Sequence, residues 1–254
     1  MTAVVLDIQK VNKCLGNQTV LSDVDLQIPS GEIYGLIGLN GAGKTTLIKC
    51  MLDLQRPDSG AIGIFGASSL DRRAREKLIY LPEKFLPPDY MTGWIYLNYV
   101  ADVYEATIRP AGKNPAWRDE IHRLCAKLEL APEALNKNVR QFSKGMLQKL
   151  GLIGCLLSNQ QFLILDEPTS GLDPKARVLF RKMIAELRTQ GKTVLLCTHI
   201  LNDIERLCDR VGLLHQGRIL FAGTPGECCR KYQAEDLESA FLSSIEKNLT
   251  MERT

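Results

Sequence analysis

The sequence lacks any apolar run long enough to cross a bilayer. The longest uninterrupted run, residues 150–157 with glycines counted, has about eight residues, whereas a membrane-spanning helix needs ~20. The residues after Met1 also lack the basic stretch, long apolar core and small-residue cleavage site of a signal peptide. We therefore expect the chain to stay in the cytosol.

An excess of one charge and paired cysteines are also missing. The 32 basic and 29 acidic residues give a net charge of +3, which is too small to indicate nucleic acid or an acidic membrane surface as a partner. The eight cysteines form no Cys-x-x-Cys pair, and several lie in apolar runs, where cysteine behaves as a small buried hydrophobe. This pattern disfavours a disulfide framework and a cysteine metal centre.

The clearest feature present is a glycine-rich segment with the spacing of a phosphate-binding loop. Its residues are Gly38, Leu39, Asn40, Gly41, Ala42, Gly43, Lys44, Thr45 and Thr46. An apolar run at 33–37 predicts a strand before the loop, and apolar residues at helical spacing predict a helix after it. Glycines let backbone N–H groups approach phosphate, and the helix start adds a positive dipole end. Lys44 can then reach the β and γ phosphates of a nucleotide, and the Thr45 hydroxyl can bind Mg²⁺.

The rest of the chain predicts an α/β fold. Residues 3–37 alternate as strands joined by turns, which indicates an antiparallel edge, and the helix after Lys44 is expected to end near residues 56–60. Continuous apolar runs are typical of buried parallel strands. Strands are expected at 61–65, 78–81, 162–165 and 193–197, with a hairpin at 211–221 broken at Gln216-Gly217.

Helical periodicity marks the other segments. One face in the 83–159 segment carries Trp94, Leu97, Val100, Ala101 and Tyr104, and another carries Ile121, Leu124, Cys125 and Leu128. Residues 108–115 are expected to form a loop between them. A later helix, closed by Gly191, is predicted with its inward face formed by Val178, Leu179, Met183, Ile184 and Leu187. The last helix is expected to dock on its own domain through Leu237, Phe241, Ile245 and Leu249.

These elements predict a phosphate-loop core with a mostly parallel sheet, an antiparallel β edge and an inserted helical subdomain. The core comprises residues 1–82 and 160–230. The helical subdomain comprises 83–159, and an amphipathic helix and tail occupy 231–254.

Two carboxylates follow the apolar run at 162–165. Asp166 and Glu167 are therefore predicted at the carboxyl end of a parallel strand, where open α/β sheets bind ligands. Asp166 would bind Mg²⁺ through its water shell, and Glu167 would orient or deprotonate the water that attacks the γ-phosphate. Beside a phosphate loop, this interpretation is favoured over a merely solvated acidic pair.

Four motifs in order make the chain resemble the ATPase subunits of ABC transporters, from about residue 4 to residue 221. They are the phosphate loop, the segment Phe-Ser-Lys-Gly-Met-Leu-Gln at 142–148, the segment Asp-Glu-Pro-Thr-Ser-Gly-Leu-Asp-Pro at 166–174, and His199. The resemblance implies that Ser143 and Gly145 belong to a signature motif that closes over the γ-phosphate held by a second subunit. It likewise implies that Asp173 lies in a loop that crosses this dimer interface, and that His199 is a switch histidine contacting the γ-phosphate.

The sequence departs from the family pattern at several positions. Leu15 stands where an aromatic residue usually stacks on adenine. Glu83 replaces a glutamine that senses Mg²⁺ and links to the membrane partner, although its carboxylate still offers an oxygen ligand. The signature carries Lys144 and Met146 in place of the commoner glycine and glutamine. With residues 81–83 and 236–241, this variant resembles the exporter branch whose permease is a separate chain.

Simpler structural roles remain open for some of these residues. Ser143 can cap a helix that runs to residue 157, and Asp173 followed by proline is the expected start of another helix, so we expect two roles at Asp173. A histidine after a buried strand is often structural, but its neighbours favour a phosphate contact for His199. His122 and His215 lack such neighbours and are interpreted as structural.

The resemblance implies a subunit that pairs two copies head to tail around two Mg-ATP, hydrolyses ATP and drives a separate permease at the inner face of the cell membrane. The permease contact is expected around residues 83–104. Phe85, Trp94 and Tyr96 are either exposed there or part of the core, and core is favoured for Trp94. The alternative, a soluble ABC ATPase of nucleic-acid repair or translation, is disfavoured because the chain has no long coiled-coil insertion, second ATPase half or basic arm. A module that only binds ATP is disfavoured because Glu167 and His199 are present.

Overall fold

The computed structural model describes residues 3–104 and 115–251, and it divides the chain into two compact units. One unit combines Met1–Lys77 with Leu187–Thr254, and the other is Leu78–Glu186. We call them the first and second units. The predicted loop at 108–115 lies almost wholly outside the described residues. The subdomain boundaries predicted from the sequence remain a prediction.

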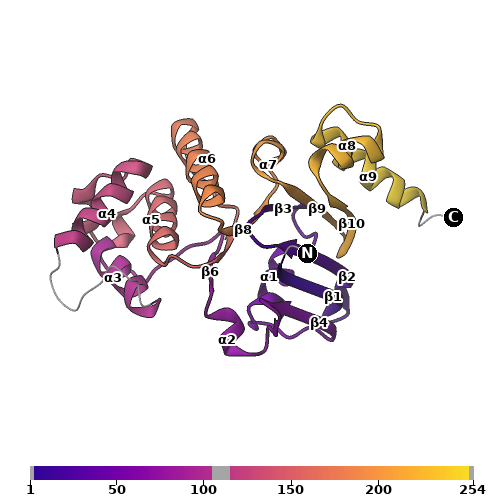
Figure 1. Cartoon of the computed structure of the whole chain (residues 1–254), viewed down its shortest axis with the longest axis horizontal. Helices are drawn as coiled ribbons and strands as arrows, with labels where there is room; N and C mark the ends of the chain where they lie inside the picture. Colours follow the sequence, from indigo (N-terminus) through magenta and orange to yellow (C-terminus); the bar gives the residue numbers. More distant parts are fainter. Residues whose placement is uncertain (1–2, 105–114, 252–254) are drawn as a thin grey trace. The chain divides into compact units, whose positions relative to one another are not determined.

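An antiparallel sheet lies at the start of the first unit, as predicted. Its strands are β1 (Val4–Leu15), β2 (Gln18–Pro29), β4 (Ser59–Ile64) and β5 (Ala67–Ser68), in the order β2-β1-β4-β5 (Figure 1). Alternate residues Val24, Leu26 and Ile28 of β2 are buried, which is the period-2 pattern of a strand with one face on a core.

The other strands of the first unit carry the predicted phosphate loop. They are β3 (Ile33–Ile37), β8 (Thr193–Thr198), β9 (Arg210–His215) and β10 (Arg218–Gly223), in the order β10-β9-β3-β8. Strand β3 is parallel to both β8 and β9, and every residue of β3 and β8 is buried. The predicted hairpin at 211–221 is confirmed, with its turn at Gln216-Gly217.

The first unit also contains α1 (Lys44–Met51), α2 (Arg72–Arg75), α7 (Leu201–Leu207), α8 (Pro225–Tyr232) and α9 (Leu237–Met251). Helix α1 ends earlier than the predicted stop near residues 56–60, because the chain turns at Leu52 and Asp53 takes a left-handed φ of 56°. Helix α9 packs on α7 and α8. Docking of the last helix on its own domain is confirmed for Leu237 and Phe241, which are buried, and Ile245 is half-buried; Leu249 lies outside the residues whose burial is described.

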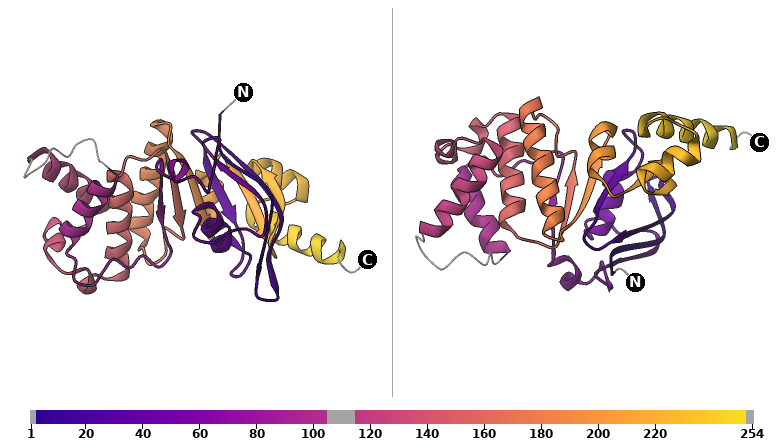
Figure 2. Two further views of the ribbon diagram at one scale, coloured as in Figure 1. Left: turned by 90° about the horizontal axis from the view of Figure 1, so that it is seen from below. Right: turned by 45° about the horizontal axis from the view of Figure 1, so that its top comes forward.

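The second unit contains a parallel strand pair and a group of helices. Strands β6 (Leu78–Leu81) and β7 (Phe162–Asp166) pair in parallel. Helices α3 (Gly93–Val103) and α4 (Pro115–Leu128) pack on α5 (Lys144–Leu157), as both views of Figure 2 show. Two 3₁₀ helices, Pro132–Asn136 and Val139–Gln141, connect α4 to α5. Helix α6 (Pro174–Thr189) begins in this unit.

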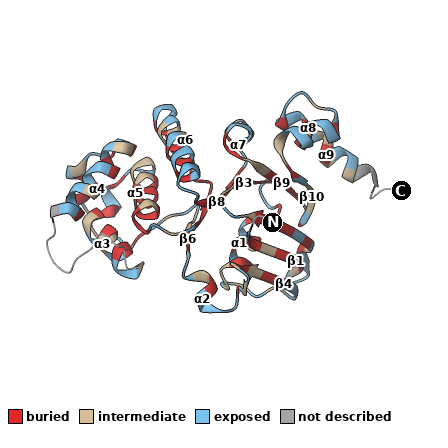
Figure 3. Cartoon of the chain, in the orientation of Figure 1, coloured by how far each residue is buried: buried red, intermediate tan, exposed pale blue. Residues whose placement is uncertain are grey.

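The buried face of α6 differs from the predicted one. Val178 is 41% exposed and Leu179 is half-buried, whereas Phe180 is 1% exposed. Buried and exposed positions alternate along this helix (Figure 3), and the buried stripe consists of Ala176, Phe180, Met183, Ile184 and Leu187. Val178 lies two residues from both Ala176 and Phe180, or about 200° around the axis, so a stripe through those two residues turns Val178 to the outside.

None of the helices within residues 3–104 and 115–251 combines the length and the hydropathy of a bilayer-spanning segment.

Candidate nucleotide-binding site

The predicted phosphate loop connects β3 to α1 in the first unit. Gly43 is the N-cap of α1, has a left-handed φ of 109° and has no side chain that could cap the helix. The start of α1 is therefore shaped for an external anion, which can accept hydrogen bonds from backbone N–H groups and interact with the positive dipole end.

Two glycines of this loop, Gly38 and Gly43, are required by the space around them. A Cβ atom on Gly38 would lie 2.6 Å from the Leu214 carbonyl oxygen, and one on Gly43 would lie 2.8 Å from the Val20 carbonyl oxygen. Both contacts are with backbone atoms, which cannot move aside as a flexible side chain could. The loop therefore keeps its backbone in a cradle that any larger residue would fill.

The Lys44 ammonium group lies against this loop. Lys44 is 7% exposed, and its Nζ donates hydrogen bonds to the carbonyl oxygens of Gly38 at 2.5 Å and Leu39 at 3.4 Å. An ammonium group has three N–H donors, so one donor remains beyond these two bonds for a phosphate oxygen. The following residue, Thr45, is exposed at the same helix start. The residues present thus fit a nucleotide phosphate with Mg²⁺.

The β9–β10 hairpin supports the loop from behind through Gly217. The Gly217 N–H donates to the Ala42 carbonyl oxygen at 3.0 Å, and the Gly217 carbonyl oxygen accepts from the Ser22 N–H at 2.9 Å. A Cβ atom on Gly217 would lie 2.4 Å from the Val20 carbonyl oxygen. The sequence identified Gly217 only as a turn residue. A Gln-Gly pair indicates a turn, but it does not indicate that the turn contacts Ala42.

The carboxyl ends of β3 and β8 bring a second predicted residue to the same edge of the sheet. Ile37 pairs with Thr198 in these parallel strands, so Gly38 and His199 leave neighbouring strand ends, and His199 is exposed. Leu15, the predicted adenine contact, lies at the end of β1 opposite Gln18 and is also exposed.

The carboxyl ends of β6 and β7 bring three predicted residues to one edge of the strand pair in the second unit. Leu81 pairs with Leu165 in these parallel strands. Glu83 therefore follows the end of β6, and Asp166 and Glu167 lie at the end of β7 on the same edge. Asp166 is 2% exposed and Glu167 is 7% exposed, whereas Glu83 is exposed. Glu167 has a φ of 48°, a left-handed conformation that is uncommon for a residue other than glycine.

The signature residues Ser143 and Gly145 lie at the start of α5. Ser143 is the N-cap, and its Oγ accepts a hydrogen bond from the Met146 N–H at 3.2 Å. Asp173 is likewise the cap of α6: its Oδ1 accepts from the Ala176 N–H at 2.8 Å, and this bond lowers the pKa of the Asp173 carboxyl. Both predicted caps are confirmed.

Ser143, Gly145 and Asp173 border one cavity of about 570 Å³ in the second unit. Its other lining residues come from the ends of α4 and α5, the first 3₁₀ helix and the loop before α6: Glu129, Leu130, Ala131, Ala134, Lys144, Met146, Lys149, Gly171 and Leu172.

Comparisons with known proteins agree with this architecture. The family model described as "ABC transporter" matches residues 21–170. An uncharacterized ABC transporter ATP-binding protein of Synechocystis is 38% identical over 83% of this chain and 59% of its own length. A lantibiotic transport ATP-binding protein of Streptococcus pyogenes is 35% identical over 94% of this chain and 97% of its own length. A solved ATP-binding subunit of an ABC transporter superposes with a TM-score of 0.85 at 32% identity, covering 95% of this chain and 99% of that one.

The chain therefore belongs to the ABC transporter family, and its fold is that of the family's ATP-binding subunits. It spans 59% and 62% of the length of the first two curated relatives that it matches. The predicted fold class is confirmed, whereas the individual roles of the site residues stay predictions.

Proposed function

We propose that this chain binds and hydrolyses ATP as a subunit of an ABC transporter of the exporter type. The observation that carries the proposal is the glycine cradle at the start of α1, with the Lys44 ammonium held against it. Membership of the ABC transporter family and the likeness to a lantibiotic transport protein support the transporter role. They do not favour the alternative of a soluble ABC ATPase acting in nucleic-acid repair or translation.

Each residue of the proposed site has a distinct task. The loop N–H groups and Lys44 bind the phosphates of ATP, and His199 contacts the γ-phosphate. Glu167 orients or deprotonates the attacking water. Thr45, Asp166 and Glu83 would hold Mg²⁺ directly or through water, and Mg²⁺ when bound neutralises charge that develops on the phosphates. Leu15 would offer the adenine an apolar contact but no aromatic ring on which to stack.

A second copy would complete the site. Ser143, Gly145 and Asp173 border a single cavity, and the cap at the start of α5 is compatible with an anion site there. We infer that two copies pair head to tail, so that these residues of one copy close over the γ-phosphate bound to the other. ATP binding would close the pair and hydrolysis would reopen it.

The contact with a separate permease is proposed on the outer face of α3. The aromatic residues that the sequence offered for this contact have partners within their own unit: the Phe85 and Tyr96 ring centroids are 5.1 Å apart, and those of Trp94 and His122 are 5.8 Å apart. A different apolar stripe, Ile95, Tyr99 and Val103 at intervals of four, is exposed. We propose that this stripe binds a cytoplasmic segment of the permease, which would hold the chain at the inner face of the membrane.

The test is ATP hydrolysis by the detergent-solubilised complex that co-purifies with this chain, compared with a Glu167→Gln variant. Removing the carboxylate should lower kcat by about 10²-fold or more, while ATP binding is retained. A Lys44→Ala variant should instead lose ATP binding. Hydrolysis by Glu167→Gln at the parent rate would reject Glu167 as the base. Purification of the chain alone or with nucleic acid would reject the permease partner.

A further inference from the structure

We propose that Lys144 is a positioning residue that fastens the start of α5 to the loop after Glu167, and so keeps Glu167 in its hydrolytic position. This inference rests on the proposed function, in which Glu167 acts on the attacking water. It concerns a position where the chain departs from the commoner family signature, which has a glycine and therefore no side chain to make this contact.

The contact itself has a polar and an apolar part. Lys144 is the first residue of α5, and its Nζ donates a hydrogen bond of 2.7 Å to Ser170 Oγ. The Lys144 stem covers Gly171: a Cβ atom on Gly171 would lie 2.9 Å from both Cγ and Cδ of Lys144. A lysine stem that packs along the backbone while its ammonium binds a hydroxyl fixes both position and direction.

The two backbones meet at glycines directly beneath this side chain. A Cβ atom on Gly145 would lie 2.9 Å from the Gly171 carbonyl oxygen, and Gly171 has a left-handed φ of 80°. The start of α5 and the 167–172 loop therefore touch without intervening side chains. Two glycine surfaces can slide past each other, because neither carries a side chain that interlocks. The Lys144 side chain provides the contact that prevents this sliding.

A short chain of bonds connects this contact to Glu167. The Ser170 N–H donates to the Glu167 carbonyl oxygen at 3.0 Å, and the Leu172 N–H donates to the Thr169 carbonyl oxygen at 3.2 Å. The hydroxyl held by Lys144 thus lies one turn from Glu167. Glu167 has a φ of 48°, and such a conformation persists only where the surroundings impose it. Fastening the turn at Ser170 is one way to impose it.

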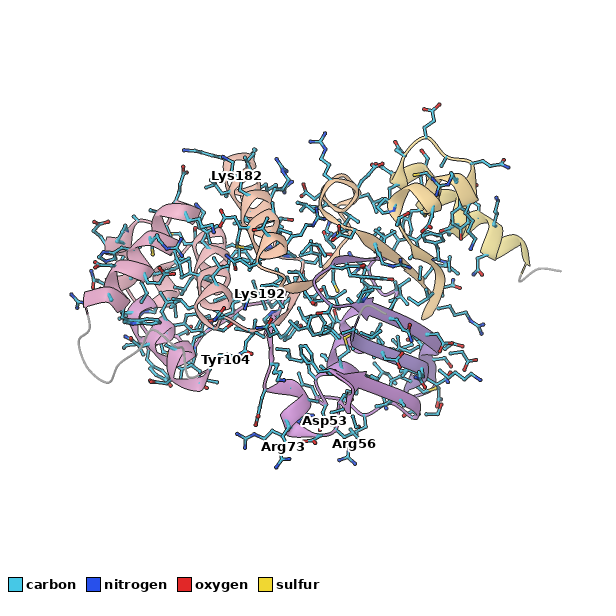
Figure 4. All side chains as sticks on the ribbon, viewed as in Figure 1. Asp53, Arg56, Arg73, Tyr104, Lys182 and Lys192 are labelled. Atoms are coloured by element: carbon cyan, nitrogen blue, oxygen red, sulfur yellow. The ribbon has the colours of Figure 1, made fainter. Side chains whose placement is uncertain are left out.

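The experiment compares four variants of the full chain: Lys144→Met, which keeps an apolar stem without the ammonium; Lys144→Arg, which restores a donor; Ser170→Ala; and the double variant Lys144→Met/Ser170→Ala. Lys182→Met serves as the matched control, because Lys182 is an exposed lysine of α6 in the same unit, outside the site (Figure 4). The measurements are kcat and KM for ATP, and hydrogen exchange in a peptide covering residues 165–175.

We expect Lys144→Met and Ser170→Ala each to lower kcat about fivefold with KM unchanged, since a hydrogen bond between a charged donor and a hydroxyl near the surface has this order of effect. The double variant should be no slower than either single one, and Lys144→Arg should recover most of the rate. Exchange in the 165–175 peptide should be faster in Lys144→Met and unchanged in Lys182→Met.

Several results would overturn the inference. A higher KM in Lys144→Met with a normal Ser170→Ala would mean that Lys144 binds phosphate itself. Additive losses in the double variant would mean that the two side chains act separately, and unchanged exchange would mean that no fastening exists. If the parent chain does not hydrolyse ATP, the proposed function fails, but the exchange measurement still decides whether Lys144 holds the loop.

Discussion

Gly217 supports the phosphate loop with its backbone alone, and this predicts an unequal response to the same substitution at two glycines. Gly217→Ala and Gly191→Ala both place alanine at a left-handed φ, which costs about 1 kcal/mol. A Cβ atom meets nothing within 4 Å at Gly191, but at Gly217 it would lie 2.4 Å from the Val20 carbonyl oxygen. Gly217→Ala should therefore be the less stable variant in urea unfolding, and it should bind ATP about tenfold more weakly as the bond to Ala42 is displaced.

Gly191→Ala is the control, because it introduces the same backbone strain but displaces no neighbouring atom. Its ATP affinity should equal that of the parent chain. Equal affinities for the two variants would show that the hairpin does not position the phosphate loop. Equal unfolding free energies would show that the Val20 contact relaxes at no cost.

The contrast between Lys44 and Gly217 shows what the sequence could predict at this scale. The phosphate loop was predictable because its glycines, its lysine and the helix that follows lie within one short segment. The bond from Gly217 to Ala42 joins distant parts of the chain, so no local pattern contains it. The same applies to Lys144: the sequence marked it as a departure from the family signature, but only the fold brings it to Ser170.

At the scale of elements, the exposed stripe on α3 predicts that a substitution within it weakens binding of the permease and leaves ATP binding unchanged. Tyr99 is 56% exposed at the centre of the Ile95, Tyr99 and Val103 stripe. A glutamate there would bring a charge into an apolar interface, so Tyr99→Glu should weaken co-purification of the permease about tenfold or more. Val178→Glu on α6 is the matched control, because Val178 is also an exposed apolar residue of the second unit. Equal recovery of the permease with both variants would place its contact elsewhere.

Helices and strands with a clear periodicity of apolar residues were predicted well. The error in α6 arose because a run of adjacent apolar residues did not share one face of the helix. The run Val178, Leu179 and Phe180 offered three adjacent apolar residues, and the helix can bury only those that share the stripe of Ala176 and Met183. In α3 the same principle separates Leu97 and Val100, which are buried, from Tyr99, which is not. Apolar character alone could not decide which face meets a partner.

Across the whole molecule, six of the eight cysteines are buried, in line with the apolar runs in which several of them lie. All eight are free thiols, with Cys14 exposed and Cys229 half-buried. Burial raises the pKa of the Cys125 thiol to about 11 and that of Cys155 to about 12. Burial likewise raises the pKa of Cys228 to about 12. These thiols remain neutral at physiological pH and react slowly with thiol reagents in the folded chain.

The raised thiol pKa values predict that stability falls in alkaline solution. The pKa of an unfolded cysteine is about 8.5, whereas burial raises the pKa of Cys155 to about 12. Its contribution to the free energy of unfolding is therefore complete below the unfolded value. That contribution is lost, at about 1.4 kcal/mol per pH unit, as the pH rises toward the folded value. Urea unfolding between pH 7 and pH 10 should show a shallower decline for Cys155→Ala than for the parent chain. Cys14→Ala removes an exposed thiol and should follow the parent; parallel curves for all three chains would mean that Cys155 is not a source of the alkaline loss.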